Sequence, residues 1–503
     1  MILLQMNLLF LYYIFYFPTI FTLLHQNRNF FNHLVIYCKG MADLDFFFNP
    51  ESIAVLGASS KPGKIGYTVL KSIIDAGYEH EIYPINISAE EILGLKTYKS
   101  ILDVPGKVDL AVYTLPAKYA PQTVEECGKK GVRGIIIISG GFKELDGEGA
   151  KLERQTLENA NKHKIRIIGP NCVGILNVKA KFDTFFQPRY AMSRPESGNI
   201  SVLTQSGTFG LSILECFSEE NLGVAKFVSY GNKADVDELD MLRYLEKDQE
   251  TKIIVLYVEG LSNGKEFMRL AKNIGKSKPM VMLKAGRTSA GAKAAKSHTG
   301  SLSGDHAVFS GAMRQCGVVL VDDIDEMVDV LKILSMQSLP KGNNVAMITN
   351  GVGPCVIATD EIEVTNNLNL SILGDGSIKK LKGILPDFCI FSNPLDITGS
   401  ATAEWYRHSL DVLLEDENVH IIMPFFVFQD APLSETVEEL HAIMKEIQNS
   451  GKTMACVSTG GKFTKKQVVK LQRNGIPCFP TPKRVVKALS KVVWYADYLR
   501  RSL

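Results

Sequence analysis

The chain has 503 residues, a length that predicts about three domains. Its 56 Lys and Arg residues against 54 Asp and Glu leave a formal charge of +2, so no strong global field would draw it to nucleic acid or an anionic membrane. With 46% apolar and 22% charged residues, the composition excludes a disordered chain. The nine cysteines form no CxxC pattern, which argues against a disulfide framework or a structural zinc site and predicts a cytoplasmic protein.

Residues 1–40 differ in composition from the rest of the chain. The run Met1–Leu24 is mostly apolar and long enough to cross a bilayer. No Lys or Arg precedes Arg28 and no small-residue cleavage site follows the run, so a secretory signal is not indicated. Because Met41 directly precedes a well-formed domain start, we expect residues 1–40 to reflect a misplaced start codon, with a membrane anchor as the alternative.

Beyond these residues, short apolar runs alternate with helix-like stretches, which is the pattern of βαβ units that form parallel sheets. The runs predict three tandem α/β domains over 45–188, 199–338 and 343–499, joined by linkers at Arg189–Gly198 and Leu339–Asn344. The strands expected in the first are Ile53–Leu56, Glu81–Ile85, Asp109–Thr114, Gly134–Ser139 and Arg166–Ile168. Those in the second are Ile200–Leu203, Ala225–Ser229, Ile253–Val258, Met280–Leu283 and Val318–Val321. Those in the third are Val345–Thr349, Ile421–Phe426, Thr453–Val457 and Ile476–Cys478.

The first expected strand runs into a glycine-rich turn that opens a helix, over Val55–Gly66. Glycines permit close backbone approach, and free N–H groups at a helix start favour a phosphate. The turn is not a Walker A loop, because five residues separate Gly57 from Gly63 where that motif has four, and it lacks the second glycine of GxGxxG. It indicates either a site for a nucleotide-type diphosphate or an ordinary helix start.

The second and third expected domains open in the same way. Gln205-Ser206-Gly207-Thr208 follows a strand and enters an apolar stretch, and Asn350-Gly351-Val352-Gly353 repeats the device. Hydroxyls, amides and free N–H groups suit a phosphoryl group, although Ser206 or Thr208 can equally cap the helix. Two such helix starts in neighbouring domains make a shared anion pocket plausible, because each positive helix end stabilises negative charge.

A histidine, His298, lies in a long stretch of Gly, Ala and Ser after the strand Met280–Leu283. Small neighbours favour an open loop, and an imidazole there can accept a phosphoryl group and so split one difficult transfer into two easier ones. Glu259 ends another strand, where ligand-facing residues collect in open α/β sheets, and its carboxylate could accept a hydrogen bond from the imidazole. The alternatives are a solvated loop histidine and a surface glutamate.

Six short motifs together make the chain resemble the α subunits of ADP-forming acetyl-CoA synthetase, relatives of succinyl-CoA synthetase. In chain order these motifs are Gly57-Ala58-Ser59, Gly169-Pro170-Asn171-Cys172, Gln205-Ser206-Gly207-Thr208, Ser229-Tyr230-Gly231-Asn232, Ser297-His298-Thr299-Gly300 and Asn393-Pro394-Leu395-Asp396. The resemblance covers about Asp45 to Leu499. It implies an acid–thiol ligase in which a Rossmann-like CoA-binding domain precedes two flavodoxin-like CoA-ligase domains.

The resemblance implies the reversible reaction of acyl-CoA, ADP and phosphate to an organic acid, CoA and ATP, through an acyl phosphate and a phosphohistidine. His298 would carry the phosphoryl group, with Glu259 orienting the imidazole. The residues implied around CoA are Gly57, Ser59, Lys64, Gly66, Asn86 and Pro116. Those implied around the phosphoryl group are Ser206, Gly207, Thr208, Asn350, Gly351 and Gly353.

The family forms ATP in an ATP-grasp domain, whose Gly-rich lid hairpin and paired metal carboxylates are absent from this sequence. The resemblance therefore implies that ADP, ATP and Mg²⁺ bind a separate ATP-grasp β subunit in an α2β2 hetero-oligomer, and no metal site is expected here. Acetate is the default acid, and a branched or an aryl acid stays possible because small pocket changes alter selectivity modestly.

Three other interpretations stay open. A catalytically inactive CoA-binding regulator of the same fold would need neither His298 nor Glu259, and both are present. A nicotinamide-dependent dehydrogenase would need an acidic ribose partner after its second strand, where this chain has Asn86. A protein acyltransferase would need an acetyltransferase domain that the length does not accommodate.

Overall fold

The computed structural model describes residues 44–145, 147–291, 293, 305–448 and 451–502. The residues from Phe46 onward belong to one compact unit. The expected misplaced start or anchor at 1–40 lies outside the described residues. Among the residues that are described, none of the helices is both long and apolar enough to span a membrane.

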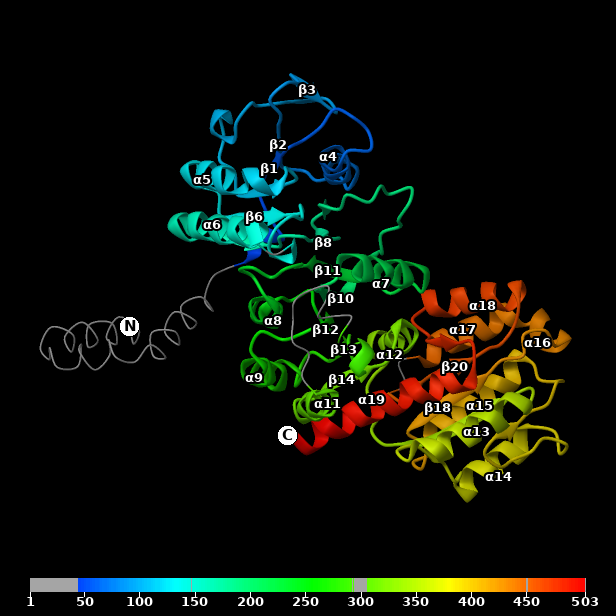
Figure 1. The fold of residues 1–503 in the computed structure, drawn as a ribbon. Coiled ribbons are helices and arrows are strands. Elements are labelled where there is room, and N and C mark those ends of the chain that lie inside the picture. Colours follow the sequence, from blue (N-terminus) through cyan, green and yellow to red (C-terminus); the bar gives the residue numbers. More distant parts are fainter. Residues whose placement is uncertain (1–43, 146, 292, 294–304, 449–450, 503) are drawn as a thin grey trace, which may run out of the picture. The chain divides into compact units, whose positions relative to one another are not determined.

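The first sheet, at the blue and cyan end of the ribbon in Figure 1, has five parallel strands in the order β2-β1-β5-β6-β7. Its strands are β1 Ser52–Leu56, β2 Glu81–Ile85, β5 Leu110–Tyr113, β6 Gly134–Ile137 and β7 Arg166–Ile168. Its helices are α4 Ile65–Asp75, α5 Ala120–Lys130 and α6 Gly147–His163, and β3 Glu91–Ile92 pairs with β4 Leu95–Lys96 in a separate hairpin. All residues of β1, β5 and β6 are buried, as expected of central strands covered on both faces.

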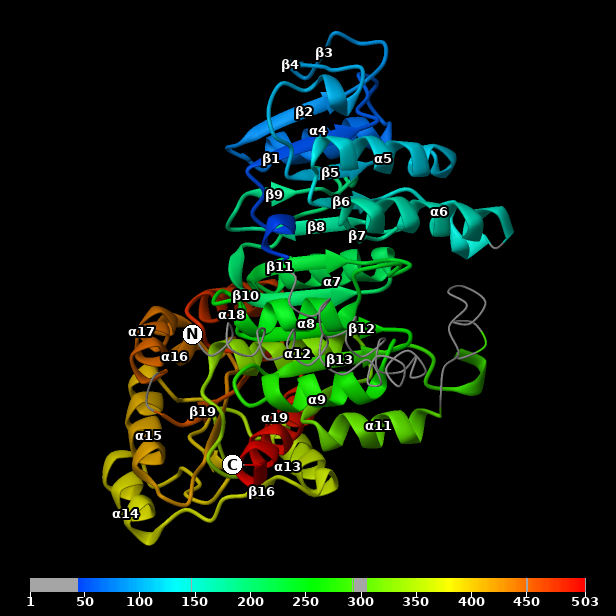
Figure 2. The ribbon, with the colours of Figure 1, turned by 90° about the vertical axis from the view of Figure 1, so that its left-hand side faces the viewer.

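The second sheet has seven strands in the order β14-β13-β12-β10-β11-β8-β9. The parallel strands are β10 Ser197–Thr204, β11 Val224–Ser229, β12 Ile253–Val258, β13 Met280–Lys284 and β14 Val318–Val321. The helices are α7 Gly207–Glu219, α8 Glu238–Lys247, α9 Gly264–Ile274, α11 His306–Gln315 and α12 Ile324–Met336. Figure 2 shows α8 and α9 side by side over this sheet, where they also contact each other.

Two short strands of the second sheet were not predicted. Strands β8, Gly174–Asn177, and β9, Phe182–Asp183, extend the sheet beyond β11 in antiparallel pairing. Both come from the range 45–188 that the sequence assigns to the first domain. In addition, β10 begins at Ser197, inside the expected linker Arg189–Gly198, so that prediction was wrong for its last two residues.

The third sheet follows the order β16-β15-β18-β20-β21, with β17 on β15 and β19 on β18. Its strands are β15 Asn344–Thr349, β16 Asn369–Leu370, β17 Leu395–Asp396, β18 Ile421–Phe425, β19 Thr453–Met454, β20 Cys456–Val457 and β21 Cys478–Phe479. Its helices are α13 Gly353–Thr365, α14 Asp375–Ile384, α15 Ala403–Glu415, α16 Ala431–Glu435, α17 Val437–Ile447, α18 Lys462–Arg473 and α19 Pro482–Ser502. The expected strand Thr453–Val457 is divided at Ala455, and Asn344 belongs to β15 instead of the expected linker.

All three sheets share one strand order. Counted along the chain, the five parallel strands on the main path of each sheet, which leaves out β17 and β19 of the third, follow 2-1-3-4-5, which is the flavodoxin-like order. The order reverses between the first and third strands, and ligands of open α/β sheets bind beyond the carboxyl ends of the strands at that switch point. The three-sheet α/β class is confirmed, and the domain bounds 45–188, 199–338 and 343–499 stay a prediction.

The second and third sheets share a hydrophobic core. Helix α19 packs against both α12 and α13, and its Val485, Leu489 and Val492 are fully buried. An ion pair reinforces the contact, because Arg484 of α19 donates to both carboxylate oxygens of Asp329 on α12, at 2.6 and 2.9 Å. The last helix of the chain therefore joins two sheets into one packed body.

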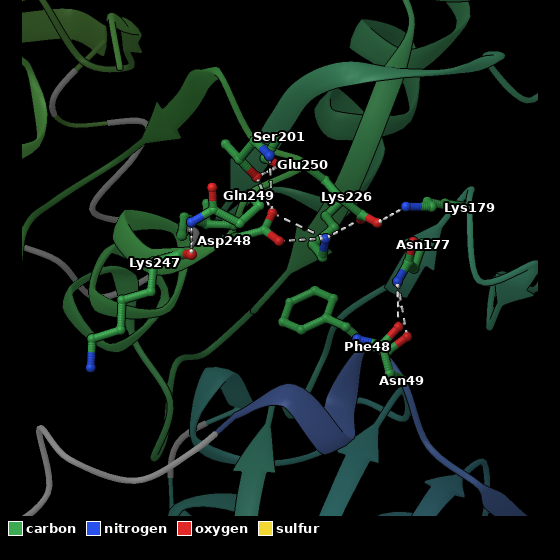
Figure 3. A network of polar contacts seen from close by, with 12 residues as sticks. Phe48, Asn49, Asn177, Lys179, Ser201, Lys226, Lys247, Asp248, Gln249 and Glu250 are labelled. Carbon is green, nitrogen blue, oxygen red and sulfur yellow. Dashed lines mark hydrogen bonds and ion pairs between the residues drawn. The ribbon is translucent and has the colours of Figure 1, made fainter. Parts of the chain in front are cut away.

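A buried lysine, Lys226 on β11, anchors the connection between α8 and β12 (Figure 3). Only 2% of the residue is exposed, and its ammonium donates to both oxygens of Asp248 at 3.0 Å and to Glu250 at 2.6 Å. The exposed Lys179 pairs with the other oxygen of Glu250 at 2.9 Å. Burial alone would raise the pKa of Asp248, but hydrogen bonds from Thr251 and Lys226 hold that pKa below its usual value.

Replacing Lys226 by Met should destabilise the fold, because the packing is kept while two carboxylates lose their buried cation. We expect a loss of about 3 kcal/mol, measured as a lower unfolding midpoint at neutral pH. The lowered pKa of Asp248 adds stability above the ordinary carboxyl pKa and loses it in acid, so the difference from wild type should shrink below pH ~4. Lys179→Met is the matched control, since an exposed pair contributes less than ~1 kcal/mol, and equal losses in both variants would contradict this account.

Candidate functional site

The glycine turn after β1 is held by contacts that only glycine permits. Gly57 has φ +90°, in the left-handed region, and a Cβ on Gly66 would lie 2.0 Å from the carbonyl oxygen of Gly57. The hydroxyl of Thr114, just after β5, donates to the carbonyls of Leu56 and Gly57 at 2.9 and 3.2 Å. The start of α4 is therefore pressed against the turn at the switch point of the first sheet.

The residues expected around CoA come together at this switch point. Helix α4 begins after Lys64, and no side chain caps the N–H groups of its first turn. Asn86, after β2, donates to the carbonyl of Ala58 at 2.8 Å and thereby fixes the turn. Ser59 accepts from the amide of Lys61 at 3.1 Å, and Pro116 follows β5. A turn that leads into a helix start without a capping side chain, beside a lysine, is typical of a phosphate-binding site.

A cavity of about 270 Å³ opens at the carboxyl edge of the second sheet. Four of the expected site residues line it, namely Ser206, Gly207, Thr208 and Glu259. The other lining residues are Ile138, Lys143, Glu144, Asn171, Cys172, Val173, Phe186, Gln205, Gly231, Asn232 and Lys233. The cavity lies at the switch point between β10 and β12, where the strand order predicts a ligand.

The start of α7 forms one wall of this cavity. The hydroxyl of Ser206 accepts from the amide of Phe209 at 3.3 Å, so Ser206 caps the helix as its sequence position allows. Gly207 lies so close to the facing wall that a Cβ would be 2.5 Å from Cγ2 of Val173. Because Ser206, Gly207 and Thr208 all line the cavity, the positive end of α7 faces it, which favours an anion there.

Glu259 is held at the opposite side of the switch point by Gln205. The side-chain oxygen of Gln205, after β10, accepts from the main-chain N–H of Glu259 and, at 3.1 Å, from that of Gly260. Glu259 is 6% exposed, and its Oε2 atom has no hydrogen-bond partner among the described residues. Burial and the charge of Glu259 raise the pKa of the neighbouring Tyr257 to about 12. A buried carboxylate oxygen is thus left for a ligand or for a residue outside the described ranges.

A polar cluster that sequence reasoning missed closes the cavity from the side of the first sheet. The amide of Asn232, after β11, donates to Glu144 at 2.6 Å, and Lys143 donates to the main-chain carbonyl of Asn232 at 3.1 Å. Burial opposes ionisation of Glu144, but hydrogen bonds from Asn232 and from the amide of Gly141 lower its pKa. Asn171 and Asn232 belong to motifs that carried the family resemblance. Membership of these motifs was the only feature of the sequence that pointed to a place for them in the site.

The phosphoryl-binding turn expected in the third domain is not brought to this cavity. His298 lies outside the described residues. The turn with Asn350, Gly351 and Gly353 does not line the cavity. Asn350 is 2% exposed, and its amide is engaged by the hydroxyl of Tyr406 and by both main-chain polar groups of Val427. The Asn350 side chain therefore fixes its own turn, and the main-chain N–H groups of Asn350 and Gly351 are engaged as well, by the hydroxyls of Tyr406 and Thr349.

The cysteine in the cavity wall is a packed thiol. Cys172 is 4% exposed and donates to the carbonyl of Ile137 at 3.3 Å, and burial raises its pKa to about 12. The eight cysteines among the described residues are all free. Within the same described ranges, no group of three or more His, Cys, Asp or Glu side chains is arranged to hold a metal ion.

Comparison with known proteins places these features in a family. Residues 51–178 match the model of a CoA binding domain, and residues 197–334 match that of a succinyl-CoA ligase like flavodoxin domain. The alpha subunit of acetate–CoA ligase [ADP-forming] II of Pyrococcus furiosus is 40% identical over 457 residues, which cover 90% of this chain and 98% of that protein. The 4-hydroxybutyrate–CoA ligase [ADP-forming] of Nitrosopumilus maritimus is 34% identical, and the match covers 90% of this chain and 64% of that protein.

A solved structure agrees with the sequence matches. The dinucleotide forming acetyl-coenzyme A synthetase 1 of Ca. Korarchaeum cryptofilum, in complex with phosphate and ADP, matches with a TM-score of 0.85 and 35% identity. The match covers 92% of this chain and 99% of that chain. These findings confirm the resemblance and the fold class that the six motifs predicted.

The tight contact between α7 and the cavity wall can be tested with Gly207→Ala. The added Cβ forces Val173 to move, and overpacking of this kind costs about 1–3 kcal/mol, so the unfolding midpoint should fall. Val173→Ala in the same chain removes the clashing methyl group, and the double variant should be more stable than the sum of the two single changes predicts. Purely additive effects would show that the two residues do not touch.

Proposed function

The chain belongs to the family of the alpha subunits of ADP-forming acetate–CoA ligases, and from this premise we propose that, in an ADP-forming acyl-CoA synthetase, it converts acyl-CoA and phosphate to an acid, CoA and a phosphoryl group carried on His298. The observation that carries the proposal is the cavity at the switch point of the second sheet. There the positive start of α7 and the buried carboxylate of Glu259 face the same space. A phosphoryl group and the residue that accepts it need this combination.

CoA is assigned to the switch point of the first sheet. The glycine pair Gly57 and Gly66 would let its phosphates approach the main chain at the start of α4, with Lys64 and the Ser59 turn beside them. Asn86 holds that turn and Pro116 follows the end of β5, so these two residues would shape the site more than they bind the anion. When bound, CoA supplies the thiol whose acyl thioester is cleaved.

The chemistry assigned to the cavity begins with attack of a phosphate oxygen on the thioester carbonyl. A carbon–oxygen bond forms, the carbon–sulfur bond breaks, and the CoA thiolate leaves, which yields an acyl phosphate. The main chain and hydroxyls of Ser206, Gly207 and Thr208 would hold the phosphoryl oxygens at the helix start. A ring nitrogen of His298 then attacks phosphorus and releases the carboxylate of the acid.

Glu259 would orient the imidazole during this transfer. Its Oε2 atom, unpartnered among the described residues, would accept a hydrogen bond from the ring nitrogen that does not carry phosphorus. A carboxylate at that position also stabilises the positive charge that develops on the ring. An inactive CoA-binding regulator would have no use for a buried acid aimed at the anion site.

The second helix start is assigned a supporting role. Because the amide of Asn350 is occupied within its own turn and the N–H of Gly351 donates to the Thr349 hydroxyl at 2.9 Å, contacts to the phosphoryl group would come from the main chain of Gly353. Gly353 is exposed at the start of α13, and a Cβ there would meet nothing within 4 Å, so the position is open to a ligand.

The nucleotide is assigned to a partner. The relatives of similar length are named as alpha subunits, which supports a second subunit in the working enzyme. We assign ADP, ATP and Mg²⁺ to an ATP-grasp β subunit in an α2β2 assembly, to which phosphorylated His298 would deliver its phosphoryl group. The free thiols of the described residues support an assignment to the cytoplasm, where cysteines stay reduced.

Acetate is the assigned acid. The cavity of about 270 Å³ must hold both the phosphoryl group and the acyl chain, and the apolar side chains of Val173 and Phe186 narrow it. The acetate–CoA ligase of Pyrococcus furiosus is a close relative, while the relative from Nitrosopumilus maritimus is named for 4-hydroxybutyrate. A substrate panel therefore belongs in the first assay.

The proposal predicts that the purified chain binds CoA yet forms ATP from acetyl-CoA, ADP and phosphate only with its co-expressed partner. Gly66→Ala should weaken CoA binding at least tenfold by calorimetry, because the clash is with the main chain of Gly57 and no side chain can yield. Gly383→Ala, on α14 with open space around it, is the control and should bind like wild type. Robust turnover without a partner, or wild-type CoA binding by the Gly66 variant, would refute these assignments.

A further inference from the structure

Lys284, the last residue of β13, is a buried cation that the chemistry above does not use. The residue is 8% exposed, and among the described residues its ammonium bonds to main-chain carbonyls instead of a carboxylate. Lysines are seldom buried without a charged partner, because removal of the ammonium from water costs free energy that some interaction must offset. The burial of Lys284 therefore indicates an interaction that offsets the free-energy cost of removing its ammonium from water.

The ammonium of Lys284 is directed at the main chain beside the cavity. It donates to the carbonyl oxygen of Glu259 at 2.9 Å and to that of Ala285, and it lies 5.5 Å from the ring centre of Phe309. Its hydrogen bonds thus join the carboxyl ends of two adjacent parallel strands, β12 and β13.

The main chain of Glu259 is consequently held from both sides. On one side, Gln205 beyond β10 accepts from its N–H group, and on the other, Lys284 of β13 donates to its carbonyl oxygen. Strands β10 and β13 are the two neighbours of β12 in the sheet. Lys233 extends the same arrangement by donating to the carbonyl of Gly260 at 2.9 Å. Both polar main-chain groups of the residue that carries the carboxylate are therefore fixed by side chains.

We propose that Lys284 is a positioning residue that fixes the carboxylate of Glu259 in the cavity for phosphoryl transfer. The inference rests on the proposed function, since it assigns Lys284 to the same site. The two groups also interact electrostatically: burial lowers the pKa of Lys284, and the negative charge of Glu259 opposes that shift. Loss of the ammonium would leave the Glu259 carbonyl without its donor and the end of β12 free to relax.

Lys284→Met and Lys284→Gln, assayed with the co-expressed partner, test this role, and Lys278→Met is the matched control. Lys278 precedes the opposite end of β13 and also donates to two main-chain carbonyls, those of Leu245 and Asp248 at 2.5 and 2.7 Å, far from the cavity lining. Melting temperature and CoA affinity verify the fold of each variant, and Lys284→Gln provides the comparison if Lys284→Met does not fold.

The expected result is a kcat lowered about tenfold or more in both Lys284 variants, because a small displacement of an orienting group costs rate steeply. KM for acetyl-CoA should stay within twofold of wild type, and Lys278→Met should keep wild-type kcat. Lys284→Arg should recover part of the rate, since its guanidinium can also donate to carbonyls. In the Glu259→Gln background the Lys284 changes should have little further effect, because both residues act through one carboxylate.

Three results would overturn the inference: wild-type kcat in both Lys284 variants, a loss no larger than that of Lys278→Met, or a loss that is as large without the Glu259 carboxylate as with it. Failure of the proposed function gives a different result. If the wild-type chain with its partner forms no ATP from any acyl-CoA, both the proposed function and this inference are refuted. If the wild type is active and Lys284 does not matter, the inference alone falls.

Discussion

A single amide oxygen, Oε1 of Gln205, joins the two strands between which the site lies. This oxygen accepts hydrogen bonds from the N–H groups of Glu259 and Gly260. It therefore connects the end of β10 to the end of β12 at the point where the strand order reverses. The positive start of α7 follows Gln205 directly, so the same contact sets the distance between an anion-binding helix end and a buried carboxylate. Everything assigned to the cavity depends on this arrangement.

The three sheets repeat one strand order and one glycine-rich device, yet each uses it differently. In the first, Gly57 and Gly66 bring a helix start and a turn into main-chain contact, which suits an extended phosphate ligand. In the second, Ser206 caps the helix while Gly207 meets the wall at Val173, which makes a small enclosed space. In the third, the Asn350 side chain forms hydrogen bonds to Tyr406 and Val427 that hold its own turn. The repeated topology supplies three possible anion sites, and the local side chains decide what each can bind.

Strands with continuous apolar runs were predictable because burial on both faces demands that composition, and each of the fourteen expected runs overlaps at least one strand of the structure. The short antiparallel pair β8 and β9 was missed, since strands of four and two residues carry no periodic signal. Glu259 could be placed at the cavity from its position at a strand end. Lys284, Asn232 and Glu144 could not, because their roles arise from contacts between segments that are distant in sequence.

The central claim is that the cavity at the edge of the second sheet passes its phosphoryl group to one histidine of this chain. The most direct measurement is mass spectrometric mapping of the phosphorylated residue after the enzyme, with its partner, is incubated with labelled ATP and quenched in alkali. The account predicts that the label lies on the peptide that contains His298 and that acid releases it. Label on any other residue, or turnover with no labelled protein, would contradict the account.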